Sequence, residues 1–115
     1  MLSLARDAYD DILAHAEAGD DEEICGVLAG ERRGEGSDDV GHVETVHRAS
    51  NAADSPRTRY LIDPEEQLAI IEAIEDAGRE VVGFYHSHPR GPPLPSETDA
   101  ERAAWPGYSY AICVP

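Results

Sequence analysis

EVVGFYHSHPRGPPLPSETD, residues 80–99, joins the clearest strand pattern of the chain to its densest group of candidate ligands. Residues 80–88 are rich in β-branched and aromatic side chains, which favours a strand, and the proline that follows ends it. Side chains two residues apart on a strand point to the same face of the sheet. His86 and His88 are therefore expected to project together from one side of the sheet, near the end of a strand.

Two adjacent imidazoles make a bidentate start for zinc, which takes four ligands in most protein sites. Asp99 is the candidate third ligand, because segment 89–98 holds four of the chain's eight prolines and is therefore stiff. Three protein ligands plus water are typical of catalytic zinc. An alternative stays open: Ser96 can cap a helix whose first turn contains Asp99, where a carboxylate favours the positive end of the helix dipole.

The chain before this stretch alternates between helix and strand signals. Apolar residues at helical spacing predict a helix over residues 4–18, which Gly19 can end. Two apolar runs on either side of a polar, glycine-containing segment predict a hairpin of strands 23–31 and 40–49. A loop follows, with a short strand expected near 60–62.

A second helix is expected to begin after Asp63, which can cap it, with Pro64 in the first position and Glu66 completing a capping box. Gly78 is expected to end this helix. Its predicted apolar stripe consists of Leu68, Ile71 and Ile74.

A short helix over 96–104 and a final strand over 108–114 complete the expected elements. Strands and helices in this order predict an α/β fold, with a mixed, curved sheet packed against two to three helices. At 115 residues the chain is expected to form one domain, residues 1–115, without a second catalytic or binding domain.

The net charge of −15 arises from 24 acidic residues against nine basic ones, all of them arginine. Such a surface repels nucleic acid phosphates and anionic membranes, so neither is an expected partner. At molar ionic strength the Debye length falls to about 3 Å and screens the self-repulsion. We interpret the acidic, lysine-free composition as adaptation to a salt-rich cytoplasm.

The N-terminal residues carry charges throughout and no apolar run reaches transmembrane length, so we expect a cytoplasmic protein without a signal peptide. Cys25 and Cys113 lie within apolar runs, which predicts buried, reduced thiols rather than a nucleophile.

The order of motifs across the chain resembles the JAMM or MPN+ metalloprotease family, which includes zinc isopeptidases acting on ubiquitin and its relatives. The matching pattern is E-x-x-G, then H-S-H-P, then P-S-x-x-D, carried by Glu23, Gly26, His86, Ser87, His88, Pro89, Pro95, Ser96 and Asp99. The likeness extends to SPRTRYLIDPEEQ, and with the acidic composition it is greatest to the small stand-alone archaeal branch, in particular haloarchaeal enzymes that remove ubiquitin-like modifiers. The resemblance implies the sheet architecture that this family shares with cytidine deaminases.

The resemblance also implies roles for these residues. His86, His88 and Asp99 would hold zinc, and Glu23 would act as general base and return the proton to the leaving amine. Ser96 would donate a hydrogen bond to the oxyanion. The neighbouring Glu22 is expected to be an ordinary exposed charge, because Glu23 stands three residues before the glycine of the motif, on the predicted strand.

We therefore expect a zinc-dependent isopeptidase that cleaves after the C-terminal glycine of a ubiquitin-like modifier, on lysine conjugates or linear fusions. Processing of ubiquitin-like sulfur-carrier adducts is the alternative enzymatic reaction. A non-catalytic scaffold of the MPN type is the alternative function without catalysis. The sequence ends at Pro115, where members of the family commonly continue, so the domain is expected to be short at its C-terminus.

Overall fold

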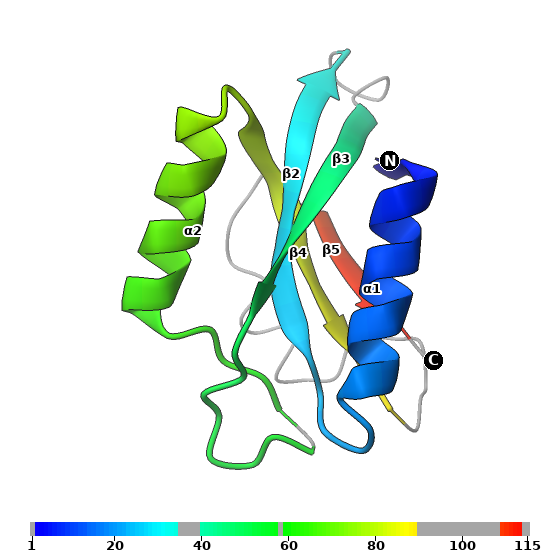
Figure 1. Cartoon of the computed structure of the whole chain (residues 1–115), viewed down its shortest axis with the longest axis vertical. Helices are drawn as coiled ribbons and strands as arrows, with labels where there is room; N and C mark the ends of the chain where they lie inside the picture. Colours follow the sequence, from blue (N-terminus) through cyan, green and yellow to red (C-terminus); the bar gives the residue numbers. More distant parts are fainter. Residues whose placement is uncertain (1, 35–39, 58, 90–108, 114–115) are drawn as a thin grey trace.

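The computed structural model describes residues 2–34, 40–57, 59–89 and 109–113 (Figure 1). Within these ranges the chain forms five strands and two helices. In chain order they are β1 (Leu2–Leu4), α1 (Arg6–Ala18), β2 (Cys25–Arg33), β3 (Val40–Ala49), α2 (Pro64–Asp76), β4 (Glu80–Ser87) and β5 (Ser109–Cys113).

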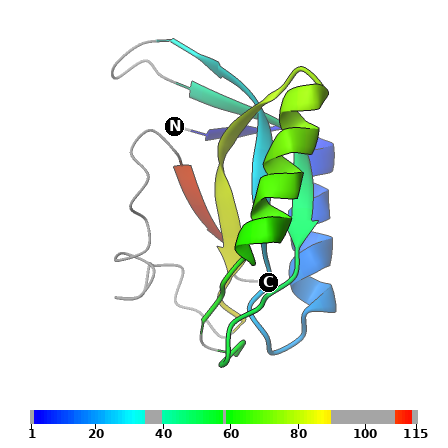
Figure 2. The same ribbon diagram turned by 90° about the vertical axis from the view of Figure 1, so that its left-hand side faces the viewer.

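The strands form one mixed sheet in the order β1-β3-β2-β4-β5. The β1–β3 and β4–β5 pairs are parallel, whereas β2 pairs antiparallel with both β3 and β4. Figure 1 shows α2 on one side of this sheet and α1 on the other, and Figure 2 shows the same layers after a quarter turn. The predicted α/β class with a mixed, curved sheet is confirmed, with two helices in the described part of the chain.

Each face of the sheet packs against one helix and forms its own apolar core. The face toward α1 buries a first cluster: Ala8, Ile12, Ala16, Ile24, Leu28, Val43, Val82 and Tyr85. The face toward α2 buries a second cluster: Cys25, Val27, Ala29, Ala49, Ile62, Ile74 and Phe84. Residues alternate between the two clusters along β2, as expected for a strand covered on both faces.

A β-bulge in β4 changes this alternation midway along the strand. Leu28 pairs with Gly83 and Ala29 pairs with Val81, so Val82 is the extra residue. Val82 and Tyr85 consequently both join the α1 side, and Phe84 joins the α2 side.

Several expected boundaries differ from the structure. The predicted helix from residue 4 begins at Arg6, because Leu2–Leu4 pair with β3 as strand β1. The expected strand over 60–62 is wrong, since these residues form no strand. Residues 96–104, where a short helix is expected, lie outside the described ranges.

Two details of α2 are also corrected. Asp63 caps the helix by accepting from the Glu65 N–H at 2.8 Å, but Glu66 does not complete a capping box. Its Oε1 instead accepts from the Ser50 N–H at 2.8 Å. Leu68, expected in the buried stripe, is 58% exposed, while Ile74 is fully buried.

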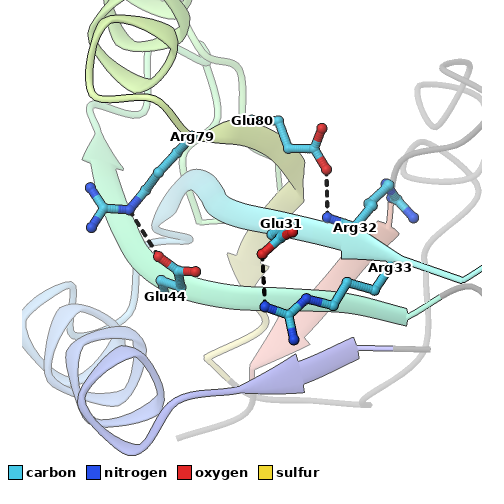
Figure 3. A network of polar contacts seen from close by, with 6 residues as sticks. All are labelled: Glu31, Arg32, Arg33, Glu44, Arg79 and Glu80. Carbon is cyan, nitrogen blue, oxygen red and sulfur yellow. Dashed lines mark hydrogen bonds and ion pairs between the residues drawn. The ribbon is translucent and has the colours of Figure 1, made fainter.

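The end of the sheet where β2 finishes and β4 begins carries charged side chains (Figure 3). Arg33 pairs with Glu31 at 2.9 Å, Arg79 pairs with Glu44 at 3.1 Å, and Glu80 accepts from the Arg32 N–H. Exposed pairs of this kind contribute little to stability and weaken as salt rises.

Within the described residues, no helix is long and apolar enough to cross a membrane.

Candidate metal centre

The opposite end of the sheet, where β4 finishes and β2 begins, brings together three side chains that can bind a metal. Glu23, His86 and His88 each offer a ligand atom, and these atoms all lie within 4.8 Å of one another. All three are buried, with exposed fractions of 5%, 3% and 8%. Burying three ionisable groups together is costly unless they share a partner such as a cation.

The two histidines converge as the strand alternation predicts. His86 is the second-to-last residue of β4 and pairs with Cys25 of β2, while His88 follows directly after the strand. Their Nε2 atoms lie 3.1 Å apart. Two nitrogens bound at 2.0–2.1 Å to one tetrahedral zinc ion lie about 3.3 Å apart, so this spacing fits a shared zinc.

Neighbouring groups hold the ring of His86 and the backbone of His88 in place. The Tyr60 ring stacks on His86, with centroids 4.4 Å apart and an interplanar angle of 21°. The backbone N–H of His88 donates to the Cys113 carbonyl at 2.9 Å, which ties this residue to the end of β5. These contacts restrict the positions of the two candidate ligands.

Glu23 reaches the site from a segment that is not a strand. The prediction that it lies on a strand is wrong, because β2 begins at Cys25. Its backbone hydrogen bonds instead go to the loop before α2: its N–H donates to the Pro56 carbonyl at 2.7 Å, and its carbonyl accepts from Asn51 Nδ2 at 2.8 Å. Glu22 is exposed whereas Glu23 is buried, which agrees with the expected distinction between them.

Ser87 links the segment after Glu23 to the end of β4. Its Oγ accepts from the Ile24 N–H at 2.9 Å, and its own N–H donates to the Ile24 carbonyl at 3.0 Å. Ser87 is fully buried. The residue between the two histidines therefore holds the chain beside Glu23 from the other side.

The remaining predicted site residues, Ser96 and Asp99, lie outside the described residues. The structure therefore brings together three of the five side chains that the sequence motifs single out. A third ligand and an oxyanion donor from 96–99 stay predictions. When bound, zinc supplies a Lewis acid that lowers the pKa of its water ligand to about 7.

The thiol of Cys25 is close to the site but is unsuited to nucleophilic chemistry. Burial, together with the charges of Glu66 and Glu23, raises the pKa of Cys25 to about 12. A thiol in this state is protonated at neutral pH and is a poor nucleophile. Both cysteines are free, and Cys113 is half-buried rather than fully buried as expected.

Sequence reasoning missed two residues that support the site: Asn51, which was expected in a loop, and Tyr60, which was expected in a short strand over 60–62. Tyr60 stacks on His86, and the Asn51 side chain bonds to the backbone of Glu23. One signal was present: an asparagine in a loop, here two residues after the predicted strand 40–49, can hydrogen bond to the backbone of that loop.

Comparisons with known proteins show the family to which the chain is related. A profile of prokaryotic homologs of the JAB domain matches residues 5–115. A desampylase of Haloferax volcanii is 55% identical over 118 residues, covering 99% of this chain and 81% of that protein. A CysO-cysteine peptidase of Mycobacterium tuberculosis is 38% identical over 112 residues, covering 97% of this chain and 72% of that protein.

A solution structure of a protein from Desulfitobacterium hafniense has the same fold. It superimposes with a TM-score of 0.86 at 35% sequence identity, and the match covers 99% of this chain and 75% of that one.

Proposed function

Because the chain belongs to the prokaryotic homologs of the JAB domain, a zinc-dependent peptidase family, we propose that it is a zinc isopeptidase acting on ubiquitin-like modifiers. Its reaction would be hydrolysis of the bond after the C-terminal glycine of the modifier, on lysine conjugates or linear fusions. The support from similarity is the 55% identity to a desampylase over nearly the whole chain.

The observation that carries the proposal is the buried group of Glu23, His86 and His88 at one end of the sheet. A non-catalytic scaffold has no need to bury a carboxylate beside two imidazoles whose nitrogens are 3.1 Å apart. Their retention together therefore favours an enzyme over an interaction module.

Each side chain receives a role in the proposed reaction. His86 and His88 would hold zinc together with Asp99. Glu23 would take a proton from the attacking water and pass it to the leaving amine, because a buried carboxylate close to the reacting atoms is suited to general acid–base work. Ser96 would donate a hydrogen bond to the oxyanion.

The experiment compares the wild-type chain with Glu23→Gln in molar salt, following release of a ubiquitin-like modifier from an isopeptide-linked conjugate. Glu23→Gln keeps the shape of the side chain but cannot accept the proton, so we expect loss of cleavage at equal zinc content. Glu22→Gln is the matched control, since this neighbour is exposed, and it should cleave at the wild-type rate. Equal cleavage by Glu23→Gln would overturn the role of Glu23.

A second substrate is favoured by one comparison, the 38% identity to a CysO-cysteine peptidase. Processing of a ubiquitin-like sulfur-carrier adduct would use the same residues and differ only in the leaving group. A zinc-loaded chain that releases cysteine from a carrier adduct but leaves lysine conjugates intact would favour this alternative.

We also propose the extent of the domain and the cellular environment in which it works. The match over residues 5–115 supports one metalloprotease domain spanning 1–115. The acidic, lysine-free composition supports work in a salt-rich cytoplasm.

A further inference from the structure

We propose that Asn51 is a positioning residue for Glu23, setting the place of the general base through its backbone. The inference rests on the proposed function, because it concerns the same reaction. Asn51 lies in the loop between β3 and α2, far from Glu23 in the sequence but joined to it directly in the fold.

The side-chain amide of Asn51 is fully used. Its Nδ2 donates to the carbonyls of Glu23 at 2.8 Å and Arg59 at 2.9 Å, and Pro56 O lies at 3.5 Å. Its Oδ1 accepts from the backbone N–H of Ala53 at 3.0 Å and of Leu61 at 3.1 Å. An asparagine amide has two donor hydrogens and two acceptor lone pairs, so both halves are satisfied.

These partners also determine the orientation of the amide. Among the described residues, the hydrogen-bond partners of Nδ2 are carbonyl oxygens and those of Oδ1 are backbone N–H groups. A flipped amide would place its oxygen against the carbonyls and its nitrogen against the N–H groups, losing every bond. The donor half therefore binds the carbonyls of Glu23 and Arg59, and the acceptor half binds the N–H groups of Ala53 and Leu61.

Glu23 depends on this loop because it stands outside the sheet. β2 begins at Cys25, so the ladder supplies no backbone bond to residue 23. Its N–H donates to Pro56 and its carbonyl accepts from Asn51, both in the loop. Asn51 also holds Arg59 and Leu61 on either side of Tyr60, the ring that stacks on His86. One side chain thus couples the base to a candidate zinc ligand.

Losing the donor half should move Glu23 without unfolding the protein. Displacing a catalytic group by about 1 Å can cost about 100-fold in rate. We therefore expect a fall of about 10-fold to 100-fold in kcat. Zinc affinity should change less than kcat, because His86 pairs with β2 and the backbone N–H of His88 donates to Cys113, independently of Asn51.

The test uses two variants of the full chain in molar salt. Asn51→Asp keeps the acceptor half and the shape, and removes the donors. Asn51→Ala removes both halves without adding charge. Asp63→Ala is the matched control, because it deletes another bond from a side chain to the backbone, the α2 cap at 2.8 Å, with no contact to Glu23.

Three quantities are measured for each protein: kcat and KM for the modifier conjugate, the zinc dissociation constant, and amide exchange of the metal-free protein. We expect both Asn51 variants to lower kcat and to speed exchange of the Glu23 amide, which donates to Pro56, while β2 and β4 keep their protection. Asp63→Ala should do neither.

Wild-type kcat in the zinc-loaded Asn51→Ala protein would overturn the inference. So would an effect confined to Asn51→Asp, which would indicate the added charge, or an equal loss in Asp63→Ala, which would indicate general destabilisation. A wild-type chain that cleaves no conjugate would instead refute the proposed function, and this inference with it.

Discussion

Replacing Gly26 with alanine should destabilise the protein by pushing the added methyl into Tyr85. A Cβ built on Gly26 would lie 2.5 Å from both Cζ and Oη of the tyrosine, which pairs with it across β2 and β4. Tyr85 is 1% exposed and shares a 2.9 Å hydrogen bond with His15, so the ring has little room to retreat. Overpacking of this kind costs about 1–3 kcal/mol, and loss of the hydrogen bond adds about 1 kcal/mol.

Denaturant unfolding in molar salt measures this expected loss of about 2–4 kcal/mol in the free energy of unfolding. A Tyr85→Leu background tests the cause, because without the ring the same glycine change should cost less than about 0.5 kcal/mol. Zinc affinity should fall in the single variant as well, since Tyr85 directly precedes His86 on the strand. Equal costs in both backgrounds would refute the steric reasoning.

Four further outcomes are expected. Ser87→Ala should lower the free energy of unfolding by about 1–3 kcal/mol in denaturant titrations, because it leaves the buried N–H of Ile24 without an acceptor; an unchanged value would contradict this. Cys25, whose pKa burial raises to about 12, should react with iodoacetamide at pH 8 only as fast as the protein unfolds, and rapid labelling of the native protein would argue otherwise. Burial, and secondarily the charge of Arg48, lowers the pKa of His15, so the unfolded chain binds a proton more readily than the folded protein. The free energy of unfolding should therefore fall as pH drops from 7 towards 5, and it should fall less in His15→Gln. The thermal midpoint should rise from low to molar salt, because screening relieves a net charge of −15, and a flat response would contradict the salt adaptation.

Local patterns were sufficient for most of the fold. The helices and the long strands follow from apolar spacing and from caps such as Asp63, because burial on one or both faces dictates that spacing. Strand β1 was missed because three residues carry too little alternation to be recognised, and it forms only by pairing in parallel with β3. The 60–62 segment was misread because Ile62 is buried, and Tyr60 partly buried, by packing onto the sheet rather than by joining it.

For the candidate site, too, local sequence patterns predicted one part and contacts over long sequence separation determine the rest. The convergence of His86 and His88 follows from a two-residue step on a strand, which is a local property. The contributions of Asn51 and Tyr60 depend on contacts over long sequence separation, and nothing in the spacing of a loop specifies its partners. Glu23 was selected through the family motif, and its true support, a loop rather than a strand ladder, could not be read from the sequence.

The bulge in β4 determines which face of the sheet receives the histidines. Val81 packs on the α2 side, and uninterrupted alternation would place residues 83 and 85 there and send His86 toward α1. The extra residue at Val82 shifts the alternation, so that Tyr85 fills the core beneath α1 and His86 faces the side where Glu23 and Tyr60 lie. A one-residue irregularity in the sheet therefore directs His86, and with it His88 just after the strand, toward the buried carboxylate of Glu23. Alternation alone predicts that the two histidines share a face, but it does not predict which face.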